Sequence, residues 1–433
     1  LPLSFSTGPN NKPVIYVHDT SDVVIKNLTV DGAGKGNANN RFIGIAYRNA
    51  GGTVTGCEIK SIRNTPINGA QAGVGIYAFS DNGNPRQLNV VSNNIYDFQK
   101  NATVLTGADL SVRVDSNTIT GAGPVAFIAQ NGVQISSGAN GSVRDNIISG
   151  LSYTPGTAVS CGVLLFQPSG IDTTSRNTLT GCQVGIYYID VGGLISENII
   201  NSTAVNNGTN VYYGIIADPG GIPHVTAEPL DVVSTSSNRS GNILDNLVLN
   251  TEIYRNVLVS DSTNGVGIEM DALGTETLNA NVTENKVNGW ATGVIFYKDA
   301  GAVLNATVND NDLNTNTIAL DNQSGVIQNS TCNWYGATDN VTISAQITGA
   351  VNYVPYLTSG TDDQGGVIGF QPVPGSCNGI PNSTINIKVL PEAFYNGLQQ
   401  LNLSDTMTVY LRSDNSPYNI LDTSVAVVDS LTF

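Results

Sequence analysis

Charged residues are scarce in this 433-residue chain, at 12% of the composition, and basic residues are the scarcer kind. With 18 Lys and Arg against 34 Asp and Glu, the formal net charge is −16, which argues against nucleic acid and anionic membrane surfaces as partners. Only two histidines are present, His18 and His224, so we expect neither a histidine-cluster metal site nor a Ser-His-Asp arrangement. No apolar run reaches the roughly 20 residues of a membrane-spanning helix, so we predict no membrane insertion.

The low charge does not indicate disorder, because apolar residues make up 40% of the chain. Asn, Ser, Thr and 47 glycines supply most of the polarity. Five cysteines are too few for a small fold built on disulfides, and the odd number leaves at least one thiol outside any intramolecular pairing. Cys161 and Cys182 lie about one repeat apart, which allows either a bond between neighbouring repeats or two buried thiols.

A short element, apolar-x-x-Asn-x-apolar, recurs along most of the chain, for example as "ISENII". Its asparagines are Asn93, Asn117, Asn146, Asn177, Asn198, Asn256, Asn285 and Asn311. Cys57 takes the Asn place in the weaker copy "VTGCEI". A second element, Gly followed by β-branched, any and apolar residues, precedes the first in most periods, as in "GIYY" at Gly185. Both elements are short, alternate with period two and are rich in Val, Ile and Tyr, which predicts strands.

Three strands with sharp turns in about 25 to 30 residues form one coil of a parallel β-helix. Asn suits such a turn because its short side chain tolerates unusual backbone angles. When coils stack, its amide can bond to the Asn above and below, which satisfies a buried polar group on every coil. We therefore predict an all-β solenoid, a parallel β-helix of about ten or more coils with an Asn ladder that Cys57 would interrupt.

The repeat resembles the right-handed parallel β-helix of the pectin-lyase-like superfamily, over roughly three quarters of the chain. The stretch "STCNWYGATDN" resembles the Asn-Trp-Trp-Gly signature that often ends the helix in secreted bacterial members, with Tyr335 in place of the second Trp. The resemblance of the following segments to the strand and loop after that signature implies a Cys332–Cys377 disulfide. Activity stays open, because the superfamily includes lyases, hydrolases, epimerases, adhesins and non-catalytic surface proteins.

The sequence pattern changes after Pro381, where stretches of alternating apolar and polar residues predict further strands but the Asn element no longer occurs. This segment resembles the opening strands of a β-sandwich module of secreted Bacteroidota-like proteins. We predict a β-helix over residues 1–345, a capping or linker segment over 346–380 and a small, incomplete β-sandwich over 381–433. Either the sequence is a fragment, or something else, such as a neighbouring subunit adding a strand, completes the module.

Strand alternation points every second residue of the Gly-led strands outward. Aromatic side chains gather in the two outward columns, namely Tyr77, Phe79, Phe166, Tyr187 and Tyr297. Three interpretations are open for this face. It binds glycans by stacking, it is covered by inter-coil loops such as residues 219–242, or it contacts another protein.

Glu269 and Asp271 lie at i and i+2 on the same outward face, with Asp218 up to two coils away. Such carboxylates could shift one another's pKa for acid–base catalysis. They could also bind calcium (Ca2+), as polysaccharide lyases of this fold do. The third interpretation is structural, because acidic residues at strand ends are common turn formers. The Gly-His-Gly, Asp-Pro-His-Glu and Arg-x-Pro-x-x-Arg motifs of the superfamily's enzymes are missing.

The leading hypothesis is a non-catalytic extracellular or cell-surface scaffold that associates with itself, as a filament, or with neighbouring surface proteins. The start at Leu1 without Met fits a processed or truncated secreted product. The alternatives are a polysaccharide-active enzyme, lyase or glycoside hydrolase, and a glycan-binding adhesin. No cofactor is expected apart from the Ca2+ option. The glycosylation state of sequons such as Asn281 does not follow from the sequence.

Overall fold

The computed structural model describes residues 3–5, 8–39, 41–155, 158–170, 172–203, 211–218, 248–261, 264–380, 405–412 and 417–428. The chain divides into two compact units, Leu1–Pro381 and Asn382–Phe433. The first unit holds three large sheets, and the second holds a two-stranded sheet. No helix in these ranges is long and apolar enough to cross a membrane.

Sheet 1 has 13 strands, all parallel except β1. Its members are β1 (Leu3–Phe5), β2 (Gly8–His18), β5 (Phe42–Arg48), β8 (Val74–Phe79), β11 (Asn101–Thr106), β14 (Asn131–Ser136), β17 (Cys161–Phe166), β20 (Val184–Ile189), β23 (Tyr212–Asp218), β26 (Gly265–Ala272), β29 (Thr292–Lys298), β31 (Ile318–Asn322) and β33 (Ile347–Thr348).

Sheet 2 has 12 parallel strands. They are β3 (Val23–Lys26), β6 (Gly52–Thr55), β9 (Arg86–Val91), β12 (Leu110–Asp115), β15 (Asn140–Arg144), β18 (Asp172–Ser175), β21 (Gly193–Ser196), β24 (Val248–Tyr254), β27 (Thr277–Thr283), β30 (Val303–Asn309), β32 (Gln328–Asn329) and β34 (Val351–Asn352). Sheet 3 has nine parallel strands. They are β4 (Thr29–Asp31), β7 (Glu58–Lys60), β10 (Asn94–Tyr96), β13 (Thr118–Val125), β16 (Ile147–Tyr153), β19 (Thr178–Cys182), β22 (Ile199–Asn201), β25 (Val257–Val259) and β28 (Lys286–Asn288).

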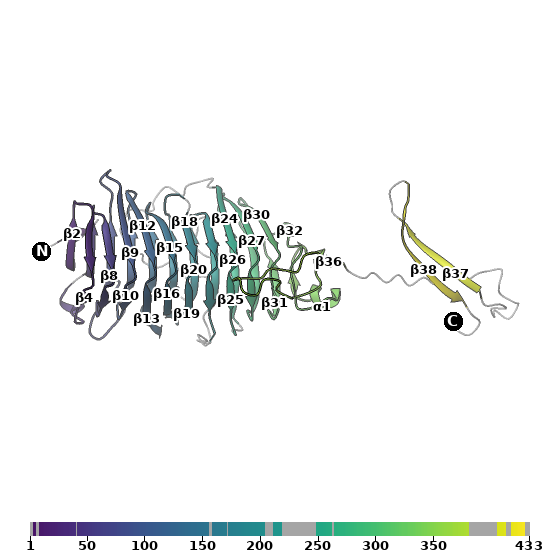
Figure 1. The fold of residues 1–433 in the computed structure, drawn as a ribbon, viewed down its shortest axis with the longest axis horizontal. Helices are drawn as coiled ribbons and strands as arrows, with labels where there is room; N and C mark the ends of the chain where they lie inside the picture. The colour runs from purple at the N-terminus through teal and green to yellow at the C-terminus, as the bar shows by residue number, and fades with distance from the viewer. Residues whose placement is uncertain are drawn as a thin grey trace. The chain divides into compact units, whose positions relative to one another are not determined.

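Each of the first nine coils adds one strand to sheet 1, then to sheet 2, then to sheet 3, and the last three add strands to sheets 1 and 2. Successive coils stack side by side, from purple β2 to green β31 in Figure 1. This is the predicted right-handed parallel β-helix. The 12 strands of sheet 2 correspond to twelve coils, in agreement with the expected ten or more.

The Gly-led elements form the strands of sheet 1, and one of them shows why glycine recurs. A Cβ on Gly185 would lie 2.6 Å from the carbonyl oxygen of Gly214 in the next coil and 2.9 Å from Cγ2 of Ile200. Beyond this glycine the strand alternates as predicted. Ile186 and Tyr188 pack in the main core, and Tyr187 lies in a second cluster on the outer side. Burying each such side chain stabilises the fold by about 1.5–3 kcal/mol.

A buried row of asparagines runs along the turns between sheets 2 and 3. In each pair of neighbours, the Nδ2 of one Asn donates to Oδ1 of the next at 2.9–3.0 Å, and its backbone N–H donates to the same oxygen. The row contains Asn93, Asn117, Asn146, Asn177, Asn198, Asn256, Asn285, Asn311 and Asn333. Nδ2 also donates to a carbonyl oxygen of the preceding coil, as from Asn117 to Val90 at 2.8 Å. The last rung, Asn333, was not among the predicted ladder residues.

The unusual backbone of this turn lies one residue before each Asn, and not at the Asn itself as we had expected. The preceding residues have φ between 54° and 58°, and include Ser92, Arg176 and Glu284. A left-handed backbone costs a non-glycine residue about 1 kcal/mol or more. The ladder hydrogen bonds offset this cost, because they satisfy the amide groups at every turn.

Beyond residue 345, the predicted end of the β-helix, the chain still adds strands β33 and β34 to sheets 1 and 2. The short helix α1 (Asn340–Ser344) precedes these strands, and an antiparallel pair, β35 (Tyr356–Leu357) and β36 (Cys377–Gly379), follows them. Ile343 and Tyr356 are buried in the main core, so the segment closes this end of the helix.

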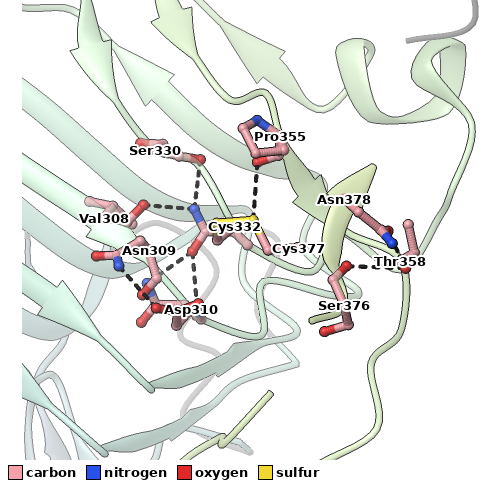
Figure 2. The surroundings of a disulfide bond; sticks show 12 residues. Val308, Asn309, Asp310, Ser330, Cys332, Pro355, Thr358, Ser376, Cys377 and Asn378 are labelled. Carbon is pink, nitrogen blue, oxygen red and sulfur yellow. Dashed lines mark hydrogen bonds between the residues drawn. A yellow bond between two sulfur atoms is a disulfide. The ribbon is translucent and has the colours of Figure 1, made fainter. Parts of the chain in front are cut away.

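A disulfide joins Cys332, directly before the last ladder Asn, to Cys377, with their Cα atoms 5.1 Å apart (Figure 2). Next to it, the backbone N–H of Cys332 donates to the carbonyl oxygen of Pro355 at 2.7 Å. The hydroxyl of Thr358 donates to the carbonyl oxygen of Ser376 at 3.1 Å. These contacts fasten the closing segment to the last coils.

In the second unit, β37 (Asp405–Arg412) and β38 (Ile420–Val428) form an antiparallel hairpin. Several of its apolar side chains are exposed, including Tyr410, Leu411 and Val425. The β-sandwich itself remains a prediction.

Candidate functional site

The three predicted acidic residues lie together on the outer face of sheet 1. Asp218 ends β23, while Glu269 and Asp271 belong to the neighbouring strand β26. All three are buried, with exposed fractions of 1%, 4% and 0%. Three carboxylates are rarely buried this deeply side by side, so the cluster is the first candidate for a functional site.

Tyrosines surround these carboxyl groups. The hydroxyl of Tyr187 on β20 lies 3.3 Å from Oδ2 of Asp218. On the other side, Tyr297 of β29 is in register with Asp271, and its hydroxyl lies 3.1 Å from Oδ1 of Asp299. The structure thus gathers residues from four successive coils, those of β20, β23, β26 and β29.

Burial is the main cause of the electrostatic behaviour of the cluster. It raises the pKa of Glu269 and raises that of Asp271 further, where the neighbouring carboxylates Glu269, Asp218 and Asp299 add to the effect. Within the described ranges, no N–H or O–H donates to either oxygen of Asp271. The two carboxyl groups of β26 interact directly, an arrangement suited to sharing one proton.

Glu269 borders a partly open cleft of about 280 Å³. Tyr213 and Tyr297 contribute its aromatic walls, and Val211, Val266 and Ile295 its apolar ones. Asp271 does not line the cleft and lies behind Glu269 on the same face of β26. The cleft thus presents one carboxyl group, two phenol rings and apolar surface to a ligand.

Tyr213 was missed from the sequence, although a signal was present. It is the residue before the Gly of its strand, and it pairs with Val184 on one side and Val266 on the other. This position forms a third outward column, separate from the two predicted ones.

The predicted aromatic columns do not form an open platform. Tyr77 is 3% exposed and packs in a cluster with Ile43, Ala46, Val74 and Val104, and Tyr187 is 1% exposed. Phe79 and Phe166 are half-buried, and the guanidinium of Arg48 lies 4.4 Å from the ring centre of Phe79. The proposed covering loop, residues 219–242, and His224 lie outside the described residues.

The structure also bears on a metal site. Among the residues with described positions, no group of three or more His, Cys, Asp or Glu is arranged to hold a metal ion.

Cys161 and Cys182 are free and buried, and Cys182 packs in the main core while Cys161 packs in the outer cluster. Burial raises the pKa of both thiols, that of Cys182 to about 12, so neither is a reactive thiolate.

A second, shallower groove of about 550 Å³ lies on the outer face of sheet 2. A row of asparagine side chains crosses it, with Nδ2 of Asn279 donating to Asn250 at 2.9 Å and Nδ2 of Asn305 donating to Asn279 at 2.8 Å. The three side chains form a chain of hydrogen bonds at the surface, in contact with water. Their polar groups therefore need no ligand as a hydrogen-bond partner.

A scan against protein-family models and searches of curated proteins and of solved structures found no match to this chain.

Proposed function

We propose that the protein is an extracellular or cell-surface β-helix scaffold that does not cleave polysaccharides. The observation that carries this proposal is the closed outer face of sheet 1. Tyr77, Tyr187, Asp218 and Asp271, the residues a polysaccharide groove would use, are each at most 3% exposed. A polymer crossing several coils would find no continuous surface there.

The disulfide supports an extracellular location, because such bonds persist in oxidising compartments. The self-supporting Asn ladder suits a protein whose role is mechanical, since each coil adds buried, satisfied turns without any ligand.

Self-association is better supported at the hairpin than at the end of the helix. The closing segment buries Ile343 and Tyr356 at the C-terminal end of the solenoid, which removes that end as an open edge. The hairpin, in contrast, exposes Tyr410 (52%) and Val425 (62%), and a two-stranded sheet is marginally stable alone. Strand addition from a second copy would cover this surface.

The catalytic part of the proposal is tested with the full chain on a panel of acidic and neutral polysaccharides. Release of reducing ends and ultraviolet absorbance of unsaturated uronates are followed, and we expect neither. Release of product that Glu269→Gln abolishes would overturn the proposal and establish an enzyme.

The assembly part is tested by sedimentation velocity over a range of concentrations. We expect the full chain to associate as its concentration rises, and Val425→Lys to weaken this, because a charge on an open strand opposes edge pairing. Val341→Lys is the matched control, since Val341 is also exposed (79%) but lies in helix α1. A monomer at all concentrations would contradict association.

A second candidate function is favoured by the position of Glu269. A buried carboxyl group with a raised pKa that borders a cleft is suited to general acid catalysis. The size of the cleft would restrict such an enzyme to the ends of glycan chains. Aryl glycosides of single sugars test it, with Glu269→Gln as the inactive comparison.

A further inference from the structure

The cleft between β23, β26 and β29 combines one carboxyl group with aromatic and apolar walls. We propose that it binds a small organic cation, whose single ammonium group contacts Glu269 between Tyr213 and Tyr297 while its carbon surface packs on Ile295. This site goes beyond a scaffold role and does not depend on it.

The charges around the cleft favour a cation. Glu269 is 4% exposed and lies beside the carboxyl group of Asp271, which is itself close to the carboxylates of Asp218 and Asp299. Among the described residues no Lys or Arg is paired with Glu269, and Nζ of Lys298 on β29 donates to the carbonyl oxygen of Asp299 at 3.2 Å. A positive ligand would supply the missing partner of a buried carboxylate.

The surroundings of Asp271 also favour a cation. This side chain is fully buried on the same face of β26 as Glu269, and apart from a proton shared with Glu269, no described N–H or O–H donates to its oxygens. Buried carboxylates with so few donors are rare, because an unmet buried group is costly. A cation held at Glu269 would stabilise the ionised form of this pair.

The ligand groups at the cleft favour an ammonium ion over a metal ion. A metal needs several oxygen ligands around one point, and the described part of the chain offers no group of three such residues. An ammonium group needs one carboxylate, and the faces of tyrosine rings strengthen its binding by cation–π attraction. Tyr213 and Tyr297 both line the cleft.

The volume of the cleft limits the size of the ligand. At about 280 Å³ the cleft lies near the lower limit for small-molecule sites, roughly 300 Å³, which admits a ligand of monosaccharide size. Val211, Val266 and Ile295 would contact its carbon atoms, so an amino sugar or an arylalkylamine fits better than a bare ammonium ion.

Binding should be coupled to proton release. Because burial raises the pKa of Glu269 and Asp271, the free pair holds a proton to higher pH than ordinary carboxyl groups do. A cation favours the ionised form, so it expels that proton and binds more tightly as the pH rises. The tyrosines facing the pair, Tyr187 and Tyr213, stay neutral because their pKa values are raised as well.

The test is isothermal titration calorimetry of the full chain with glucosamine and benzylammonium. Their uncharged counterparts, N-acetylglucosamine and benzyl alcohol, serve as ligand controls. We expect at least one cation to bind about tenfold or more tightly than its counterpart, and its affinity to rise between about pH 5 and about pH 7. Titrations in two buffers of different ionisation enthalpy should show proton release on binding.

Glu269→Gln should weaken cation binding at least about tenfold, the factor that 1.4 kcal/mol represents. Glu252→Gln is the matched control, because Glu252 is an exposed carboxylate in the groove of sheet 2, and it should leave binding unchanged. The proposal is overturned if neither cation binds, if the neutral counterparts bind equally well, or if Glu269→Gln binds like the wild type. Binding of CaCl2 that Glu269→Gln abolishes would replace it with a metal site. The pH series needs no variant, so it remains decisive if Glu269→Gln folds poorly.

Discussion

The backbone N–H of Cys57 donates to Oδ1 of Asn93 at 3.0 Å, in the same way that each ladder Asn donates to its successor. Its Sγ lies 3.7 Å from the carbonyl oxygen of Ile25 and 3.4 Å from that of Thr55, the positions that Nδ2 contacts in the other coils. Cys57 therefore ends the ladder as a weak substitute for Asn, and does not interrupt it. In the first coil Leu28 takes the equivalent place and is 47% exposed.

Replacing Cys57 with Asn should extend the ladder by one rung. The amide would donate to the Ile25 and Thr55 carbonyl groups more strongly than a thiol does, and its Oδ1 would offer an acceptor to the Leu28 backbone N–H. We expect a gain of about 0.5–1.5 kcal/mol in the free energy of unfolding, measured by urea denaturation. Cys57→Ala, which removes the donor, should lose stability. Equal effects of the two changes would contradict this role.

A rung in the middle of the ladder should matter far more. Asn177 donates to Val143 and to Asn198, and it accepts from Asn146, so Asn177→Ala leaves several buried groups unpaired. We expect a loss of about 3 kcal/mol or more in urea denaturation. The control is Asn279→Ala in the exposed row of sheet 2, which should change stability by about 0.5 kcal/mol at most. Similar losses at the two sites would show that burial of the ladder is unimportant.

The fold was predictable because the Asn element marks the same turn in nearly every coil. Asn333 is missing from the predicted ladder because it lies in "NWYG", which resembles the signature at the end of the helix and not the Asn element. The left-handed residue of the turn was not predictable either, since Ser, Asp, Arg, Glu and Cys occupy it and only Asp among them is enriched in that backbone region.

The site was predictable only in part. Alternation along β26 correctly placed Glu269 and Asp271 on one outward face. Alternation could not show that these outward-facing side chains are buried. The burial of Tyr77 and Tyr187 depends on packing against residues beyond their own strands. Tyr213 belongs to a column that lies one residue before the Gly, outside the repeated sequence element that predicts these strands.

The disulfide should stabilise the closed end of the helix. It spans 45 residues, for which loop closure predicts about 4 kcal/mol, and native strain commonly lowers such values. We expect Cys332→Ser with Cys377→Ser to lose about 2–4 kcal/mol and to expose the segment around Gly365 to protease. Cys182→Ala serves as a control for thiol loss in the proteolysis assay, because this residue forms no disulfide. Unchanged proteolysis would show that the other contacts alone hold the segment.

The acidic pair should make stability depend on pH in an unusual direction. The pKa values of Glu269 and Asp271 are raised in the folded state, so the fold binds more protons than the unfolded chain above the ordinary carboxyl values of 4.5 and 3.8. Their contribution is therefore favourable at low pH and is lost as the pH rises through the folded-state values.

The Glu269→Gln variant has no carboxyl group at this position, so it does not lose this stability as the pH rises. We expect the Tm of the variant to exceed that of the wild type at neutral pH and the difference to shrink towards about pH 4. Glu252→Gln should show no such trend, because Glu252 is exposed. A Tm difference that is constant with pH would contradict the assignment of the raised pKa values.

The central claim is that the outer face of sheet 1 is closed except at the cleft beside Glu269. Tyrosine nitration of the folded full chain, mapped by mass spectrometry, tests it most directly. The account predicts that Tyr410 and Tyr418, which are 52% and 55% exposed, react quickly, while Tyr77 and Tyr187 react only after unfolding. Nitration of Tyr77 and Tyr187 at the rate of Tyr410 would mean that this face is open and would contradict the account.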